Sequence, residues 1–327
     1  MWSQRLIAPH RFRNTEVPTP GPDDLGEGEL LVRLRVGGIC GSDIPPVRYH
    51  YDPQEKGKAL WPLHEIVGDV IASKSTSIAV GQRVVGWAKD LQGLVEVFTA
   101  YADQVVPVEP DVSDVAAVVA QPLACVMCAV DRFDSVEGKR AAVIGQGPIG
   151  LFFSRVLKSR GASEVTGIDL VERDDVAAAF GVDTTVYGSS REWAASLDRT
   201  ERPDLVVEAV GHQVGTLNDA ITACAVGGQI MAFGVNDDPY YPLDFHWLFR
   251  KNLTLHAGIT TEHGRYLKAA QDYLRAHPGL AEQYVTNVLP IDDVQQAFEI
   301  AARPATGRMK VVLTVNDHQS VGKESNR

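Results

Sequence analysis

The sequence is poor in cysteine and in long apolar runs. Its four cysteines, Cys40, Cys125, Cys128 and Cys224, are too few and too scattered for a disulfide framework. No apolar run approaches the roughly 20 residues that a membrane span needs, and no signal-like apolar stretch follows residues 1–5. We therefore expect a cytoplasmic protein with no membrane partner.

The sequence also has fewer basic than acidic residues. The chain has 31 Lys and Arg against 42 Asp and Glu, a formal net charge of -11. Such a charge disfavours nucleic acid or an anionic membrane surface as a partner. It still permits an anionic cofactor, because helix N-termini and backbone N–H groups bind phosphate locally. At 327 residues, 45% of them apolar, the chain can form one large domain or two moderate ones.

The apolar pattern changes along the chain. Residues 30–36, 66–71 and 84–87 are short apolar or alternating runs between glycines, which are typical of strands in a small barrel or sandwich. From about Asp114, Ala-rich helical stretches alternate with compact Val/Ile strands, which predicts an α/β fold with a parallel sheet. Six strands, as a doubly wound dinucleotide fold needs, are predicted at 140–144, 164–168, 184–187, 204–207, 228–233 and 253–257. Beyond them we expect helices at 264–276 and 292–302 and a strand at 310–315.

A glycine-rich loop follows the first of these six strands. Gly145, Gly147 and Gly150, with Pro148 and Ile149 between the last two, form a G-x-G-x-x-G motif. A helix is predicted directly after it, at 151–160. The glycines would supply a tight turn, space for a pyrophosphate and close packing of helix on strand. The loop therefore predicts a dinucleotide site at a helix N-terminus.

An acidic residue at the end of the second strand indicates which dinucleotide is bound. Asp169 lies 19 residues after Gly150. Its carboxylate would accept hydrogen bonds from the adenosine ribose and repel a 2′-phosphate, so we expect NAD rather than NADP. Arg173, four residues further on, could soften that preference.

Two segments of the β-rich part contain residues that commonly bind zinc. Cys40 lies in G-I-C-G-S-D at 38–43, and His64 and Glu65 lie in P-L-H-E-I-V-G at 62–68. Either segment alone would be explained by a small buried thiol or a core histidine. Together, and upstream of the glycine loop, they resemble the medium-chain, zinc-dependent alcohol and polyol dehydrogenases.

That resemblance covers nearly the whole chain. It implies a GroES-like catalytic domain at 1–122 and 259–327 and an NAD-binding Rossmann domain at 123–258. It extends to E-A-V-G at 208–211, G-G-Q-I-M-A-F-G at 227–234 and G-R-M-K-V-V-L at 307–313. In the family, the first two of these segments approach the nicotinamide and the third reaches the pyrophosphate. The implied cofactor contacts are Val210, Gly211, Gly234, Val235 and Arg308.

The resemblance also assigns catalytic roles. Cys40 and His64 would bind one catalytic Zn²⁺, and Glu65 would be a carboxylate able to enter or leave the coordination sphere. Ser42 would pass the substrate proton towards solvent, and Asp43 would orient the metal ligands without binding the metal itself. His50 and Tyr51 are candidates for substrate contact.

The sequence departs from the family pattern at three places. Leu63 replaces the glycine before the histidine, a modest change in backbone freedom. Gln121 occupies the position of the third metal ligand, where relatives place Glu, Asp or Cys, and its amide oxygen is a neutral, weaker ligand. After Trp87, residues 88–96 lack the four cysteines of the structural-zinc lobe, so we expect no structural zinc.

These features predict an NAD-dependent zinc dehydrogenase that acts on a small polar secondary alcohol or ketone, such as a polyol, sugar or cyclitol. Relatives form homodimers or homotetramers, and the same is expected here. Gln121 keeps open a metal-free reductase of the same superfamily acting on an activated double bond or quinone. A third alternative is a catalytically silent NAD-binding protein.

Overall fold

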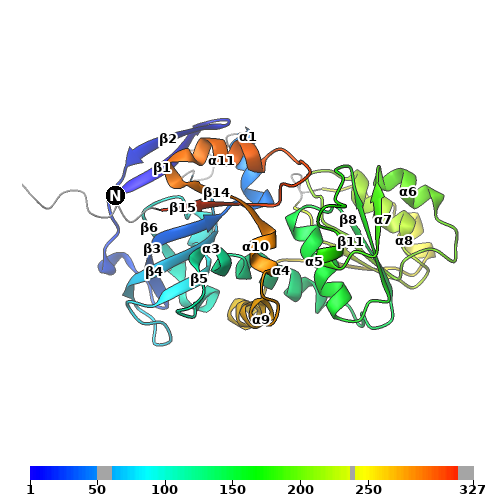
Figure 1. The fold of residues 1–327 in the computed structure, drawn as a ribbon, viewed down its shortest axis with the longest axis horizontal. Coiled ribbons are helices and arrows are strands. Elements are labelled where there is room, and N and C mark those ends of the chain that lie inside the picture. The colour runs from blue at the N-terminus through cyan, green and yellow to red at the C-terminus, as the bar shows by residue number, and fades with distance from the viewer. Residues whose placement is uncertain (50–60, 236–239, 316–327) are drawn as a thin grey trace, which may run out of the picture. The chain divides into compact units, whose positions relative to one another are not determined.

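The computed structural model describes residues 1–49, 61–235 and 240–315 (Figure 1). They form two units, which we treat separately. Unit 1 contains the described parts of Met1–Ala124, Glu262–Arg303 and Met309–Arg327, and unit 2 contains those of Cys125–Thr261 and Pro304–Arg308. The sequence placed 304–308 with the catalytic domain, whereas the structure groups these residues with unit 2.

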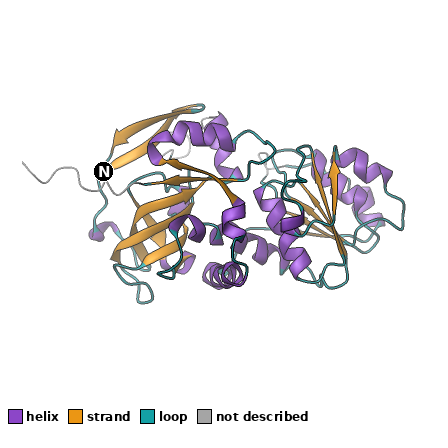
Figure 2. Cartoon of the chain, viewed as in Figure 1, coloured by secondary structure: helices purple, strands orange, loops and turns teal. Residues whose placement is uncertain are grey.

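Unit 1 is rich in strands, as the sequence predicted. Strands β1 (Trp2–Ala8) and β2 (Arg11–Glu16) form an antiparallel pair. The larger sheet is built from β3 (Glu29–Gly38), β4 (Glu65–Ser73), β5 (Arg83–Trp87), β6 (Val97–Tyr101), β7 (Val105–Pro107), β14 (Val285–Pro290) and β15 (Lys310–Thr314). Its order is β14-β15-β3-β4-β5-β7, with β6 pairing with β3. Figure 2 draws the strands in orange.

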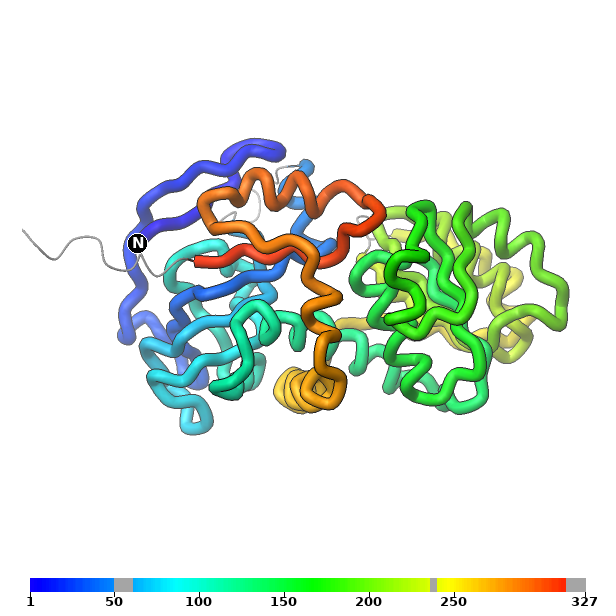
Figure 3. The backbone as a smooth tube through the Cα atoms, viewed as in Figure 1, coloured from blue at the N-terminus to red at the C-terminus, as the bar shows by residue number. Residues whose placement is uncertain are grey.

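Strand β3 lies at the centre of this unit. Leu30, Val32 and Leu34 alternate along it and are at most 2% exposed, so one face of the strand forms core. Strand β15, from the end of the chain, pairs antiparallel with β3 and places Val312 opposite Gly38. Figure 3 shows this pairing as a red segment beside a blue one. The predicted strand at 310–315 therefore completes a sheet that begins near residue 30.

Helices, most of them short, connect the strands of unit 1. They are η1 (Pro22–Asp24), η2 (Gly41–Asp43), α1 (Ile44–Tyr49), η3 (Lys89–Leu91), η4 (Ala102–Gln104), α3 (Asp114–Ala117), α9 (His263–Ala276), α10 (Leu280–Tyr284), η6 (Ile291–Asp293) and α11 (Val294–Ala301). Helix α4 (Ala120–Val130) begins in unit 1 and ends in unit 2. The predicted helices at 264–276 and 292–302 are confirmed as α9 and α11.

Unit 2 contains the predicted doubly wound sheet. Its strands are β8 (Arg140–Ile144), β9 (Glu164–Asp169), β10 (Thr184–Tyr187), β11 (Leu205–Glu208), β12 (Gln229–Ala232) and β13 (Thr254–Ala257). They are parallel and lie in the order β10-β9-β8-β11-β12-β13. The order reverses between β8 and β11, the point at which open parallel sheets bind ligands.

Helices cover both faces of the unit 2 sheet. They are α5 (Pro148–Ser159), η5 (Ala178–Phe180), α6 (Ser190–Ser196), α7 (Gly215–Ala223) and α8 (Phe245–Arg250). Figure 1 shows α5 on one face and α6, α7 and α8 on the other. Helix α5 begins three residues before the predicted 151, because Pro148 has a backbone angle suited to the first helical position. Among the described residues, no helix is long and apolar enough to cross a membrane.

Candidate functional site

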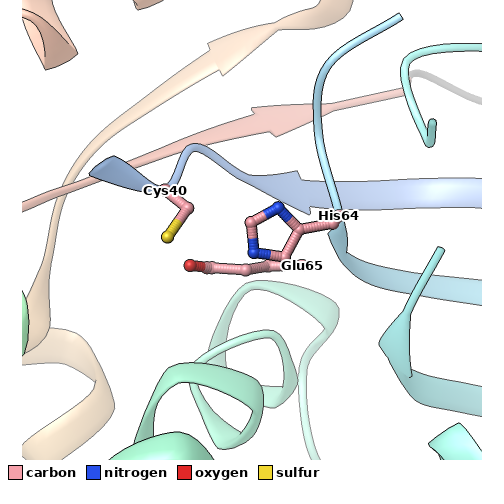
Figure 4. A group of neighbouring side chains, drawn as sticks. All are labelled: Cys40, His64 and Glu65. Atoms are coloured by element: carbon pink, nitrogen blue, oxygen red, sulfur yellow. The ribbon is translucent and has the colours of Figure 1, made fainter. Parts of the chain in front are cut away.

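Three potential metal ligands meet in unit 1. Cys40, His64 and Glu65 each offer an atom, and these atoms all lie within 4.8 Å of one another. Figure 4 shows the three side chains facing one small space. The backbone explains the meeting, because Gly38 pairs with Glu65 across β3 and β4 and Cys40 follows β3. A thiolate, an imidazole and a carboxylate are donors that zinc accepts, so the residues present fit this ion.

Asp43 orients two of these ligands. Its Oδ2 accepts a hydrogen bond from the amide of Cys40 at 2.9 Å, and its Oδ1 lies 3.3 Å from Nδ1 of His64. The contact with Nδ1 leaves the other ring nitrogen for a metal. Burial lowers the pKa of His64, but the charge and hydrogen bond of Asp43 and the neighbouring Cys40 raise it well above the usual 6.5. A metal ion would therefore displace a proton from this imidazole.

Glu65 has a partner that the sequence did not reveal. Nζ of Lys310 lies 2.5 Å from each carboxylate oxygen of Glu65 and donates a hydrogen bond to Oε1. The two side chains are 4% and 0% exposed, so each charge compensates the other in the core. Gly38 makes room for the pair, since a Cβ there would lie 2.4 Å from Oε2 of Glu65. Lys310 lies 245 residues from Glu65, a separation that no local pattern could indicate.

The residue before His64 has an unusual backbone. Leu63 has a φ of 112°, a region that side-chain-bearing residues rarely adopt, and it is fully buried. Its amide donates to Oδ1 of Asp43 at 3.2 Å, and its carbonyl accepts from Gly93 at 2.7 Å. Its side chain fills space above Gly37, where an added Cβ would lie 2.1 Å from Cδ2 of Leu63. The loss of glycine is therefore more than the modest change expected from the sequence, because such strain costs about 1–3 kcal/mol.

For Gln121 and Ser42, the other predicted residues of this site, the structure gives the position in the fold and the burial. Gln121 is the second residue of α4 and is 1% exposed. Ser42 lies in η2 beside Asp43 and is half-buried. Their roles as third ligand and proton relay stay predictions. His50 and Tyr51 lie outside the described residues.

A cavity of about 420 Å³ lies in unit 2 at the carboxyl ends of β8 and β9. This is the position expected for a dinucleotide in such a sheet. Several residues predicted from sequence line it: Gly145, Gly147, Asp169, Arg173, Val210 and Arg308.

The three motif glycines have different reasons to lack a side chain. A Cβ on Gly150 would lie 1.7 Å from the carbonyl oxygen of Gly145, so α5 could not pack on the loop. Gly145 has a φ of 90°. At Gly147, the N-cap of α5, a Cβ would meet nothing within 4 Å. That open space, beside the helix turn begun by Pro148 and Ile149, fits a phosphate group.

Asp169 is held at the edge of this cavity. Its Oδ2 accepts a hydrogen bond from the amide of Gln146 at 2.6 Å, and its Oδ1 accepts one from the amide of Val171 at 2.8 Å. Each oxygen keeps a further lone pair for a ribose hydroxyl. The carboxylate would also repel a 2′-phosphate.

Glu208 organises the loops predicted to approach the nicotinamide, a role that the sequence did not reveal although the residue begins the E-A-V-G segment. Its Oε1 accepts hydrogen bonds from the amides of Val210 and Gly211, both at 3.0 Å. Gly211 has a φ of 67°, and a Cβ there would lie 2.6 Å from the nitrogen of Val235. A Cβ on Gly234 would lie 2.2 Å from the nitrogen of Gly211. The two loops therefore touch through their backbones.

Comparisons with known proteins cover both units. The alcohol dehydrogenase GroES-like domain family matches residues 26–108, and the glucose dehydrogenase C-terminus family matches residues 108–315. D-altritol 5-dehydrogenase of Agrobacterium fabrum is 30% identical, with 88% of this chain and 93% of that protein covered. D-arabinitol dehydrogenase 1 of Uromyces fabae is 23% identical, with 83% and 86% covered. The solved alcohol dehydrogenase TADH from Thermus sp. ATN1 has a TM-score of 0.81 at 24% identity, with 97% of this chain and 100% of that chain covered. The predicted GroES-like and Rossmann fold is confirmed.

Proposed function

The chain belongs to the zinc-dependent medium-chain alcohol dehydrogenase family, and from this premise we propose that it transfers a hydride between NAD(H) and a small polar secondary alcohol or ketone. The altritol and arabinitol dehydrogenases among its relatives support a polyol, sugar or cyclitol as substrate. The observation that carries the proposal is the convergence of Cys40, His64 and Glu65.

We assign one catalytic zinc to this cluster. Cys40 and His64 are its principal ligands, and Glu65 and Gln121 are proposed to complete the set. When bound, zinc would act as a Lewis acid towards the substrate oxygen and the nicotinamide would exchange the hydride. Asp43 holds the imidazole in one tautomer through its contact with Nδ1.

Proton movement is assigned to Ser42. It lies in η2 next to Asp43 and is half-buried, so it is partly open to solvent. A hydroxyl both donates and accepts, which a relay requires.

The cavity of unit 2 is assigned to the dinucleotide. Open space at Gly147 and the N-terminus of α5 would hold the pyrophosphate, with Arg308 as its cationic partner. Asp169 supports NAD over NADP. The touching loops that contain Val210, Gly211, Gly234 and Val235 are proposed to contact the nicotinamide half.

We also propose a cytoplasmic homodimer or homotetramer. Strand β13 is the last in the sheet order of unit 2. An edge strand invites pairing with another chain, and a second copy would cover it.

The test is a spectroscopic screen of NAD⁺ reduction over polyols, sugars, cyclitols and simple alcohols, with and without added zinc. We expect turnover of hydroxylated secondary alcohols that a chelator abolishes and zinc restores. Activity confined to apolar primary alcohols would contradict the substrate class. Chelator-resistant reduction of enones or quinones would favour the metal-free reductase, and NADH binding without turnover would favour the silent protein. Cys40→Ser serves as the matched negative control.

A further inference from the structure

A short segment late in the chain is tied to the strand–helix connection after Asp169. Residues 304–308 belong to unit 2, although the residues on both sides of them belong to unit 1. We call the hydrogen bonds that hold this segment the clasp. They run from Nη1 of Arg173 to the carbonyls of Ala305 (3.0 Å) and Arg308 (3.1 Å), from Oγ1 of Thr306 to the carbonyl of Glu172 (3.3 Å), and from the amide of Gly307 to Oδ2 of Asp175 (3.1 Å).

Arg173 is the buried member of the clasp. It is 4% exposed, and its Nε is buried without a hydrogen-bond partner among the described residues. It lines the cavity together with Asp169 and Arg308. Burial lowers the pKa of Arg308, and the nearby charge of Arg173 lowers it further. Two guanidinium groups therefore share the wall of one cavity.

The hydrogen bonds of Arg173 indicate what it does there. Nη1 is directed to two backbone carbonyls, one of them that of Arg308 itself. A side chain that recognises a phosphate directs its donors to the phosphate, as a planar guanidinium does with bidentate geometry. Here Nη1 instead holds the backbone that carries the other arginine.

We propose that Arg173 is a positioning residue: through the clasp it holds Arg308 in the cavity for the pyrophosphate, and it does not recognise a 2′-phosphate. The inference rests on the proposed dinucleotide binding and adds to it. It replaces the earlier expectation that Arg173 softens the preference for NAD. The whole clasp then serves both nicotinamide cofactors equally, and selectivity is left to Asp169.

The first test compares the two cofactors. Kd values for NADH and NADPH are measured by fluorescence titration on the full chain and on Arg173→Gln. We expect both affinities to fall by the same factor, about tenfold, as for a lost hydrogen bond to a charged group. Arg173→Lys should recover part of the loss, and Arg199→Gln, at an exposed position of the same unit, should change nothing. A loss confined to NADPH would overturn the proposal.

A double-mutant cycle tests the route through Arg308. If Arg173 acts by placing Arg308, then Arg173→Gln should weaken NADH binding little further once Arg308→Gln is present. Losses of affinity that multiply in the double variant would contradict a positioning role.

Amide hydrogen exchange in cofactor-free protein gives a readout without any ligand. Exchange at Gly307 should accelerate in Arg173→Gln, with the unfolding midpoint showing that the chain remains folded.

Asp175 offers a second variant in which charge and clasp predict opposite results. Removing a carboxylate near an anion site should tighten NADH binding, whereas opening the clasp should weaken it. We expect Asp175→Ala to weaken binding about threefold, in line with one hydrogen bond of ordinary strength. Asp174→Ala removes the neighbouring exposed carboxylate, whose Oδ1 accepts a hydrogen bond from Thr185 and from no clasp residue, so it is the control for charge without the clasp. Tighter binding in Asp175→Ala would overturn the clasp.

The failure of this inference can be told apart from the failure of the proposed function. If the unaltered protein binds neither cofactor, the proposed function itself fails. If it binds normally and Arg173→Gln has an unchanged Kd, only this inference is rejected.

Discussion

The metal cluster of unit 1 and the cavity of unit 2 are built from different parts of the chain. The cluster consists of the side chains of Cys40, His64 and Glu65. Asp43 contacts the ring of His64 and the amide of Cys40, and Lys310 holds Glu65. In the cavity, the proposed phosphate position is formed by backbone, with open space at Gly147 and the N-terminus of α5 beside it. The first site therefore depends on which functional groups are present, and the second on where a side chain is absent.

The largest effect should follow from removing the thiolate. Cys40→Ser replaces a strong zinc ligand with a hydroxyl, so we expect loss of the bound metal and a fall in kcat/KM of at least about 1,000-fold. NADH affinity should stay the same, because the cavity lies in unit 2. Metal analysis and steady-state kinetics measure the first two quantities, and titration measures the third. Retained zinc with normal turnover would contradict the assignment.

Two alanine substitutions in the glycine loop should have separable effects. Gly147→Ala adds a methyl group in open space, so the protein should fold normally but bind NADH about 100-fold more weakly, because the methyl occupies the proposed phosphate position. Gly150→Ala places its Cβ 1.7 Å from a carbonyl oxygen, so it should lower the unfolding midpoint as well. Thermal melts and NADH titration of both variants test this. Equal melting losses in the two would disprove the distinction.

This contrast explains how much could be predicted from sequence. The alternation of Ala-rich helices and Val/Ile strands is a local pattern and predicted the sheet, and the spacing of Gly145, Gly147 and Gly150 predicted the loop that opens the next helix. The identities of Cys40 and His64 indicated a metal through family resemblance. The pairing of Lys310 with Glu65 could not be predicted, because β15 returns to β3 only in the folded chain.

The backbone strain at Leu63 and the clasp of Arg173 could not be predicted from the sequence either. Nothing in the identity of Leu63 shows that its φ is positive, since leucine seldom adopts that region. Arg173 was expected to contact cofactor, but the carbonyls it binds lie more than 130 residues away in the chain. Contacts of this kind depend on tertiary packing, which no local periodicity records.

A smaller loss should follow when the orienting carboxylate is neutralised. Asp43→Asn keeps the shape of the side chain but changes its contact with Nδ1 of His64, so zinc affinity should fall about 10- to 100-fold. Competition with a chromophoric chelator measures the affinity. Asp90→Asn, at an exposed position outside the cluster, is the matched control. An unchanged zinc Kd would show that Asp43 does not contribute to zinc binding.

The two sites should also differ in pH dependence. Because the pKa of His64 is raised above 6.5 in the metal-free protein, protons compete with zinc up to that higher pKa. Zinc affinity should therefore rise with pH by up to about tenfold per unit below it. The backbone N–H groups proposed to bind the pyrophosphate do not titrate. NADH affinity should therefore change much less than zinc affinity between about pH 6 and pH 8. Parallel titrations decide; a steeper profile for NADH than for zinc would contradict the contrast.

The smallest effect concerns stability. Leu63→Gly relieves backbone strain of about 1–3 kcal/mol but removes a buried side chain worth about 2–5 kcal/mol. We expect a net loss of about 2 kcal/mol in the free energy of unfolding, measured by denaturant titration. A more stable variant would show that the strain outweighs the packing above Gly37.

X-ray absorption at the zinc edge tests the central claim most directly. On protein purified with zinc, we predict one ion per chain with a sulfur neighbour at about 2.3 Å and nitrogen or oxygen neighbours at about 2.0–2.2 Å, and loss of the sulfur signal in Cys40→Ser. A chain that binds no zinc, or binds it with only nitrogen and oxygen neighbours, would contradict the account.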